Sequence, residues 1–223
     1  MQEKSRNKVQ ASESIAVMIL ITLSGGLQDA YTYITRAGVF ANAQTGNIVL
    51  LSRALFLSDW GRAFSYLIPI TAYAAGILVA ALLRHRFQKH NGILHWRHIV
   101  VLAEILLLSS VSLLPTSVNS IANAIVSFSC AMQVEAFRKA RGHAYASTMC
   151  IGNLKSCMEN LSDFIVEKKE GSLKNTLYYA LVIIVFAAGA GSGALLSIAL
   201  GIPAILFSSF LLLLSFILML RRS

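Results

Sequence analysis

The chain has 223 residues, of which 56% are hydrophobic and only 13% are charged, about half the charged share of an ordinary soluble domain. These proportions exclude an intrinsically disordered chain, a nucleic-acid-binding domain and an ordinary cytosolic enzyme, because so apolar a chain has no place in water for its surplus side chains. They predict an all-α polytopic membrane protein, in which the net charge of +9 reflects cytoplasmic loops rather than a nucleic-acid partner.

Six segments are long and apolar enough to predict spanning helices, since about 20 apolar residues cross a bilayer. The first carries Asp29 near its middle and the third contains Glu104. The fifth includes the small-residue stretch Ala187–Ala194, a kind of sequence that lets helix backbones approach closely. In chain order the predicted spans are Ser14–Ile34, Ala63–Leu83, Ile99–Leu114, Ser117–Val134, Leu177–Leu200 and Ile202–Leu220.

Two further segments, Val39–Leu57 and Ala144–Val166, are long enough to span but are polar. They leave two alternatives, namely eight spans, or six spans with two polar helices that re-enter the membrane or lie in its interface. From a cytoplasmic N-terminus, eight spans place ten Lys and Arg residues inside and eight outside, whereas six spans place sixteen inside and three outside. Because cytoplasmic loops concentrate Lys and Arg, we predict six spans with both termini in the cytoplasm.

The two halves of the chain repeat a short polar pattern, with Gln133 standing 105 residues after Gln28. The matched residues are Gln28, Arg36, Phe40, Ala41, Gly46 and Asn47 in the first half and Gln133, Arg141, Tyr145, Ala146, Gly152 and Asn153 in the second. The sequence therefore predicts a single membrane domain, 1–223, made of two three-helix repeats, 14–115 and 117–220. Because three is an odd number, the repeats would be inverted relative to each other in the membrane.

Two motifs in the first half carry a resemblance, the stretch Gly25–Ala30 (GGLQDA) and the stretch Phe40–Leu50 (FANAQTGNIVL). With its length, the chain resembles the YoaK-like family of bacterial inner-membrane proteins, a family of unknown function. One departure is Ala43, which separates Asn42 from Gln44 where the family pattern has Asn and Gln adjacent. The resemblance implies about six spans and a bacterial inner (plasma) membrane location, and it implies no substrate, reaction or catalytic residue.

Asp29 is the sharpest candidate for function. A charge at bilayer depth costs at least ~2.5 kcal/mol, so an acidic residue inside a span is a functional hypothesis by default. Gln28 precedes it, and Gly25-Gly26 could loosen the helix there and free carbonyl groups for a ligand. The alternative is structural, in which Asp29 lies near the outer interface or pairs with Arg36, two turns further on.

The first polar segment concentrates side chains that can coordinate a cation or hydrogen-bond a small polar solute. They are Asn42, Gln44, Thr45 and Asn47, with Gly46 between the last two. The alternative for each is a hydrogen bond that joins helices, as polar side chains make in many membrane bundles. For the whole cluster we favour the lining of a pore or site.

The second half holds counterparts with weaker signals. Gln133 and Glu135 correspond to Gln28 and Asp29 with the acid displaced, although Glu135 is close enough to Arg138 for an interfacial ion pair. Gly152 and Asn153 stand where the tip of a re-entrant segment would fall. Glu104 either carries a proton in the bundle interior or pairs with a cation such as Arg97, two turns earlier.

No established catalytic or cofactor motif is present, neither a nucleophile elbow nor a phosphate-binding loop nor a zinc-binding helix. Four of the five histidines lie in or beside one basic loop, without acids or thiols at metal-ligand spacing, so we predict no metal site, no cofactor and no catalytic residue. A basic loop that faces anionic lipid explains them better.

We predict a small secondary transporter or channel for a small solute or ion, whose path is lined by the polar residues of both halves. The first alternative is a membrane enzyme with a lipid-like substrate, and the second is a non-catalytic membrane assembly partner. The expected partners are the lipid bilayer and the solute, without nucleic acid, and a homodimer would be a natural way to complete a pathway. The candidate path residues are Gln28, Asp29, Asn42, Gln44, Thr45, Gly46, Asn47, Glu104, Gln133, Glu135, Gly152 and Asn153.

Overall fold

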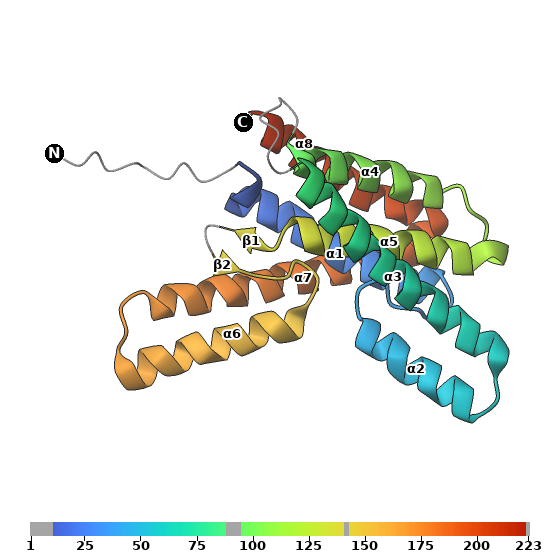
Figure 1. Ribbon diagram of the computed structural model, residues 1–223, viewed down its shortest axis with the longest axis horizontal. Helices are drawn as coiled ribbons and strands as arrows, with labels where there is room; N and C mark the ends of the chain where they lie inside the picture. Colours follow the sequence, from blue (N-terminus) through green and yellow to red (C-terminus); the bar gives the residue numbers. More distant parts are fainter. Residues whose placement is uncertain (1–10, 88–94, 141–142, 222–223) are drawn as a thin grey trace.

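The computed structural model describes residues 11–87, 95–140 and 143–221, and these residues form a helical bundle (Figure 1). Its only sheet pairing among them is the two-residue hairpin of β1 (Lys139–Ala140) and β2 (His143–Ala144). The helices are α1 (Ile15–Thr35), α2 (Gln44–Phe56), α3 (Trp60–Phe87), α4 (Trp96–Val111), α5 (Asn119–Ala136), α6 (Cys150–Ser162), α7 (Ser172–Leu200) and α8 (Ile205–Arg221).

Among the described residues, four helical stretches are long and apolar enough to cross a membrane, namely α1, α3, α7 and α8 with the short turn before it. The predicted spans 99–114 and 117–134 correspond to α4 and α5, which are not in this set. The reasons are that α4 has only 16 residues and that α5 carries polar residues at both ends. A membrane-spanning helical fold is thus supported by four helices rather than by the six that were predicted.

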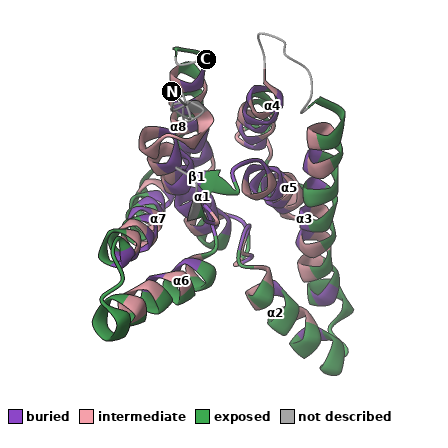
Figure 2. Cartoon of the chain, turned by 60° about the vertical axis from the view of Figure 1, so that its left-hand side comes forward, coloured by how far each residue is buried: buried purple, intermediate pink, exposed green. Residues whose placement is uncertain are grey.

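The centre of the bundle is formed by α1 and α5, each of which packs against two helices from the other half of the chain. α1 packs against α7 and α8, and α5 packs against α3 and α4. Glycines allow the closest of these approaches, because a Cβ atom at Gly189 of α7 would collide with the backbone of Leu23 in α1, and one at Gly76 of α3 with the backbone of Phe128 in α5. Figure 2 shows α3 and α7 on the flanks with much of their surface exposed.

The two polar segments form half-length helices rather than spans. α2 and α6 have 13 residues each, about 20 Å of helix at 1.5 Å per residue, which is too short to cross a hydrocarbon core of about 30 Å. Both begin near the middle of the molecule, and they run toward opposite ends while packing against α3 and α7, respectively (Figure 1). The eight-span alternative is therefore not supported.

One asparagine fixes the start of each half-length helix. The side chain of Asn47 accepts a hydrogen bond from the backbone N–H of Phe40 (3.2 Å) and donates to its carbonyl (2.7 Å). Asn153 makes the same pair of bonds to Ala146, at 3.5 and 2.8 Å. In both cases the partner lies seven residues earlier, so the chain folds back in the same way before α2 and before α6.

Candidate functional site

A cavity of about 460 Å³ separates the N-termini of α2 and α6. It lies inside a single chain, and its volume is in the range of pockets that hold small organic ligands. Its lining comes from α1, α3 and α7 and from the first turns of the two half-length helices. The lining residues are Asp29, Asn42, Ala43, Gln44, Thr45, Tyr73, Ala146, Thr148, Met149, Cys150, Ile151, Gly152 and Phe186.

The lining comes in matched pairs from the two halves. Residues 42–45 at the start of α2 face residues 148–151 at the start of α6. Tyr73 of α3 and Phe186 of α7 also correspond, because each stands three residues before the glycine that packs against α5 or α1. Asp29 has no such counterpart, since the position that matches it in α5 is Val134. The cavity thus has a nearly symmetric frame and one asymmetric charge.

Asp29 is buried, and its carboxylate accepts a hydrogen bond of 2.8 Å from the backbone N–H of Asn42, just before α2. A carboxylate there stabilises the positive end of the α2 dipole. The Asn42 side chain in turn donates to the carbonyl of Gly25 (3.2 Å). The glycines do not loosen α1, which is continuous from residue 15 to residue 35, so the freed carbonyl groups predicted for a ligand are absent and the Gly25 carbonyl binds Asn42 instead.

Several polar atoms at the cavity make no well-formed hydrogen bond within the described part of the chain, although the hydroxyls of Tyr73 and Thr148 lie close enough to interact with each other. They are the hydroxyls of Tyr73 and Thr148 and the amide oxygen of Asn42, and all three side chains are buried. A buried polar group without a partner costs about 1–3 kcal/mol, so such groups need an explanation in a stable fold. Groups that face a cavity are explained when a ligand or water completes their bonding.

Of the predicted path residues, the structure brings Asp29, Asn42, Gln44, Thr45 and Gly152 together at the cavity. Other predicted path residues join helices instead. Gln28 bonds to the side chains of Ser24, Ser208 and Cys130, and Gln133 bonds to the carbonyl of Ile21 and to Ser147. Asn47 and Asn153 hold the chain before the half-length helices, and Gly46 packs against the ring of Phe40.

Glu104 is completely buried in α4, and neither of its carboxyl oxygens has a partner among the described residues. The expected alternative, an ion pair with Arg97, is wrong. Arg97 instead bonds to the carbonyl of Ala136 (2.9 Å), to Ser12 (2.8 Å) and to Glu13 (3.4 Å). An isolated buried carboxylate is very costly, so Glu104 is a neutral acid in this conformation, away from the cavity lining.

The structural alternative for Asp29, a pair with Arg36, is also wrong. Arg36 is completely buried, and it donates to neutral oxygens where α1, α4 and α5 meet. These acceptors are the hydroxyl of Tyr31 (2.9 Å), the carbonyls of Val111 (2.8 Å) and Pro115 (3.3 Å), and the side chain of Asn119 (3.2 Å). Arg36 thus joins the end of α1 to the α4–α5 turn by hydrogen bonds. Asp29 has no cationic partner among the described residues.

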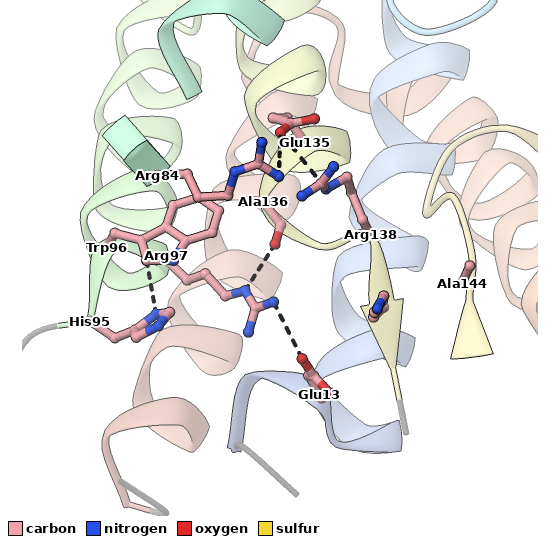
Figure 3. Close-up of a pocket in the computed structure, with 10 residues that line it drawn as sticks. Glu13, Arg84, His95, Trp96, Arg97, Glu135, Ala136, Arg138 and Ala144 are labelled. Atoms are coloured by element: carbon pink, nitrogen blue, oxygen red, sulfur yellow. Dashed lines mark hydrogen bonds and ion pairs between the residues drawn. The ribbon is translucent and has the colours of Figure 1, made fainter. Parts of the chain in front are cut away.

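A second cavity, of about 680 Å³, lies where α1 begins and the β1–β2 hairpin packs beside it (Figure 3). We call this the basic end, because Arg84, Arg97, Arg138 and Lys139 line the cavity. Both acids that line this cavity form ion pairs. Glu135 pairs with Arg84 (3.2 Å) and with Arg138 (3.7 Å), and Glu13 pairs with Arg97 (3.4 Å).

His95 also lines the cavity at the basic end. Its imidazole accepts a hydrogen bond from the backbone N–H of Arg97 at the start of α4. Burial, and then the charges of Arg97 and His98, lower the pKa of this imidazole, which favours the neutral form that can accept the bond. In the described part of the chain, no group of three or more His, Cys, Asp or Glu side chains is placed to hold a metal ion.

The sequence did not indicate the lining residues of α3 and α7, or those at the start of α6 other than Gly152. A signal for two of them is visible in the sequence, because Tyr73-Ala-Ala-Gly76 and Phe186-Ala-Ala-Gly189 share the pattern aromatic-Ala-Ala-Gly. Each copy puts an aromatic ring at the cavity and a glycine against the central helix of the other half. Thr148, Met149 and Cys150 carry no comparable signal.

The family model described as a protein of unknown function (DUF1275) matches residues 17–218, from α1 through α8. The chain belongs to this family. It is 28% identical over 185 residues to the UPF0700 transmembrane protein YoaK of Bacillus subtilis (strain 168), which covers 78% of this chain and 80% of that protein. No solved structure matches the chain. The resemblance to the YoaK-like family is confirmed, and the whole cavity lies within the DUF1275 region.

Proposed function

We propose that the protein is a small secondary transporter with an inverted repeat, and that its substrate binds in the cavity between α2 and α6. The observation that carries the proposal is the cavity lining, in which matched residues from both halves surround one buried acid, Asp29. Secondary transporters with inverted repeats bind their substrates near the bilayer midplane, where discontinuous helices from the two halves meet.

The helix packing supports an inverted repeat. If α1 to α4 correspond to α5 to α8, the most extensive contacts have counterparts, because α1 against α7 matches α5 against α3, and α2 against α3 matches α6 against α7. α4 packs against its own counterpart, α8, as expected near a two-fold axis. The proposed repeats are residues 14–115 and 117–220, each with three spanning helices and one half-length helix.

The distribution of charge supports a cytoplasmic location for the basic end, in a bacterial inner membrane. The cations at this end come from the last turns of α3 and α8, the start of α4 and the hairpin, and the turn between α6 and α7 lies at the same end (Figure 1). They include Arg84, Arg86, Arg97, Arg138, Lys139, Lys168, Lys169 and Arg221. The opposite end has Arg53 and Arg62 at the turn between α2 and α3.

Asp29 has the chemistry of a coupling residue. Among the described residues that line the cavity, Asp29 is the only charged one. Its backbone partner, Asn42, lies in the junction between the spanning helix α1 and the half-length helix α2. Protonation of Asp29 weakens its bond to the Asn42 N–H and removes the charge that stabilises the start of α2. Proton binding would in this way change both the charge of the cavity and the position of α2.

Two competing functions have less support. A membrane enzyme would need a reactive group in a cavity, but both acids that line the basic-end cavity are ion-paired, and no serine, threonine or cysteine is among its described lining residues. An assembly partner would bind through a free small-residue face, but the two glycines of α7 that pack most closely, Gly189 and Gly193, are used inside the chain against Leu23 and Leu27 of α1. The exposed remainder of that stretch is Ala187, Ala188, Gly191 and Ser192.

The native cysteines allow a direct test. Cys150 lines the cavity, whereas Cys130 and Cys157 are buried in helix contacts. In a variant that keeps only Cys150, we expect a membrane-impermeant thiol reagent to modify this cysteine from one face of the membrane. Adding Asp29→Asn to that variant should change the rate of Cys150 modification several-fold. The control keeps only Cys157 and should stay unmodified. A Cys150 that is unreactive from both faces in both backgrounds would contradict a transport path through this cavity.

A further inference from the structure

The cavity lies between two helix N-termini that differ in how their charge is balanced. At α2 the carboxylate of Asp29 accepts the Asn42 N–H and offsets the positive end of the helix dipole. At α6 the residue before the helix, Met149, makes no side-chain capping bond, and Val134 stands at the position that matches Asp29. Among the described lining residues Asp29 is the only charged one, so the N–H groups at the start of α6 face the cavity without an anion.

A second observation at the same place also indicates a missing acceptor. The hydroxyls of Tyr73 and Thr148 line this part of the cavity, and each residue is only 6% exposed. In the described part of the chain each of these two hydroxyls has only the other within reach, and a pair of hydroxyls uses one O–H hydrogen and leaves the second available to a ligand. Hydroxyl groups and helix N-terminal N–H groups together form the usual donor set for a carboxylate or another small anion.

The balance of charge indicates what must accompany the anion. Two helix N-termini contribute about half a positive charge each, so an ionised Asp29 makes the cavity roughly neutral and a protonated Asp29 makes it about +1. An anion is therefore favoured when Asp29 is protonated, and a cation would face the unbalanced start of α6. Neighbouring titratable groups do not change this sum, because Tyr73 of α3, Cys130 of α5 and Cys150 of α6 are neutral side chains. α7 and α8 have their only charges, Lys174 and Arg221, at the end turns.

The size and the apolar part of the cavity restrict the ligand further. A volume of about 460 Å³ is much larger than an inorganic anion needs. Met149, Ile151 and Phe186 contribute apolar surface beside the donor groups. We infer that the cavity binds an organic monocarboxylate with an apolar body together with one proton on Asp29, the carboxylate lying at the start of α6. This inference rests on the proposed transport function and specifies its substrate class.

The test measures binding of radiolabelled hexanoate and benzoate to the purified full-length protein in detergent, by equilibrium dialysis from mildly acidic to mildly alkaline pH. We expect saturable binding of at least one of them that weakens as the pH rises. Asp29→Asn should bind at every pH with little pH dependence. Tyr73→Phe and Thr148→Val should each weaken binding about tenfold, which is the effect of one lost hydrogen bond to a charged group.

Matched controls and competitors decide the outcome. Tyr66→Phe and Thr71→Val make the same changes on α3 away from the cavity lining and should bind normally. Bound carboxylate should also protect Cys150 from alkylation, because Cys150 begins α6. Equal competition by benzamide or benzylamine, or no binding of either carboxylate at millimolar concentration, would overturn the inference. If Cys150 were still accessible from one membrane face in that case, the proposed transport function would stand with a different substrate class.

Discussion

Asp29 stabilises the start of α2 and also lines the cavity. Its carboxylate accepts a hydrogen bond from the Asn42 N–H at 2.8 Å, and Asp29 is the only charged residue among the described residues of the cavity lining. The change Asp29→Asn keeps a hydrogen-bond acceptor of the same size but removes the charge, whereas Asp29→Ala removes both. The asparagine variant therefore separates the coupling role from the structural role, and for this reason both proposed experiments use it.

The paired asparagines provide a prediction at the level of single residues. Asn47 and Asn153 each satisfy the N–H and the carbonyl of a residue seven positions earlier. Asn47→Ala and Asn153→Ala leave these partly buried backbone groups unpaired, so we expect each to lower the free energy of unfolding by about 1–3 kcal/mol. Thermal unfolding of the purified protein in detergent measures the effect.

Asn160→Ala is the matched control for this pair. Asn160 is on α6, where its amide donates to the carbonyl of Ser156 within its own helix and its amide oxygen accepts a bond from the Asn175 side chain of α7 (3.1 Å). We expect a smaller loss of stability, because that carbonyl already belongs to the helix and the half-buried Asn175 amide can turn to another partner, whereas the backbone groups before α6 cannot. If Asn160→Ala were as destabilising as Asn153→Ala, the bonds across the turn before α6 would not be what holds it.

At the scale of helices, the contact between α1 and α7 depends on residues without side chains. A Cβ atom at Gly189 would meet the backbone of Leu23, which cannot move aside as a flexible side chain can. Gly191, two residues later on the same helix, has nothing within contact distance of such an atom. The two glycines therefore offer the same substitution in opposite environments.

We expect Gly189→Ala to destabilise the protein by about 1–3 kcal/mol, the usual cost of overpacking. Gly191→Ala should leave stability unchanged or raise it by up to about 1 kcal/mol, because alanine favours a helix more than glycine does. Melting temperatures of the two variants in the same detergent test this prediction. Equal effects of the two substitutions would mean that the close approach of α1 and α7 does not limit stability.

For the whole molecule, the inverted arrangement makes a prediction about sidedness. Asp59 lies in the turn between α2 and α3, and Glu170 lies in the turn between α6 and α7. In a cysteine-free background, Asp59→Cys should be labelled from outside intact cells and Glu170→Cys only after the membrane is opened. Labelling of both positions from the same side would rule out oppositely oriented halves.

The sequence alone was sufficient to predict the spanning helices and the polar segments, because each depends only on the composition of a short stretch of chain. A membrane requires length and apolar composition of each helix separately, so α1, α3, α7 and α8 could be recognised one at a time. The polar segments were recognised as unusual for the same reason. Asp29 and the cluster from Asn42 to Thr45 were found because charge and amide groups are costly at bilayer depth, and the family could be identified from short motifs in the same region.

The tertiary structure alone decided which polar residues share a cavity. Gln28, Gln133 and Glu104 are as buried as Asp29, but their side chains point into helix contacts, and a linear pattern does not specify that direction. The cavity also combines residues that are far apart in the sequence, namely Tyr73, Thr148 and Phe186. Only the packing of helices from one half of the chain against helices from the other half brings them together. Hydropathy acts on each helix by itself, whereas a binding cavity depends on how helices from both halves pack.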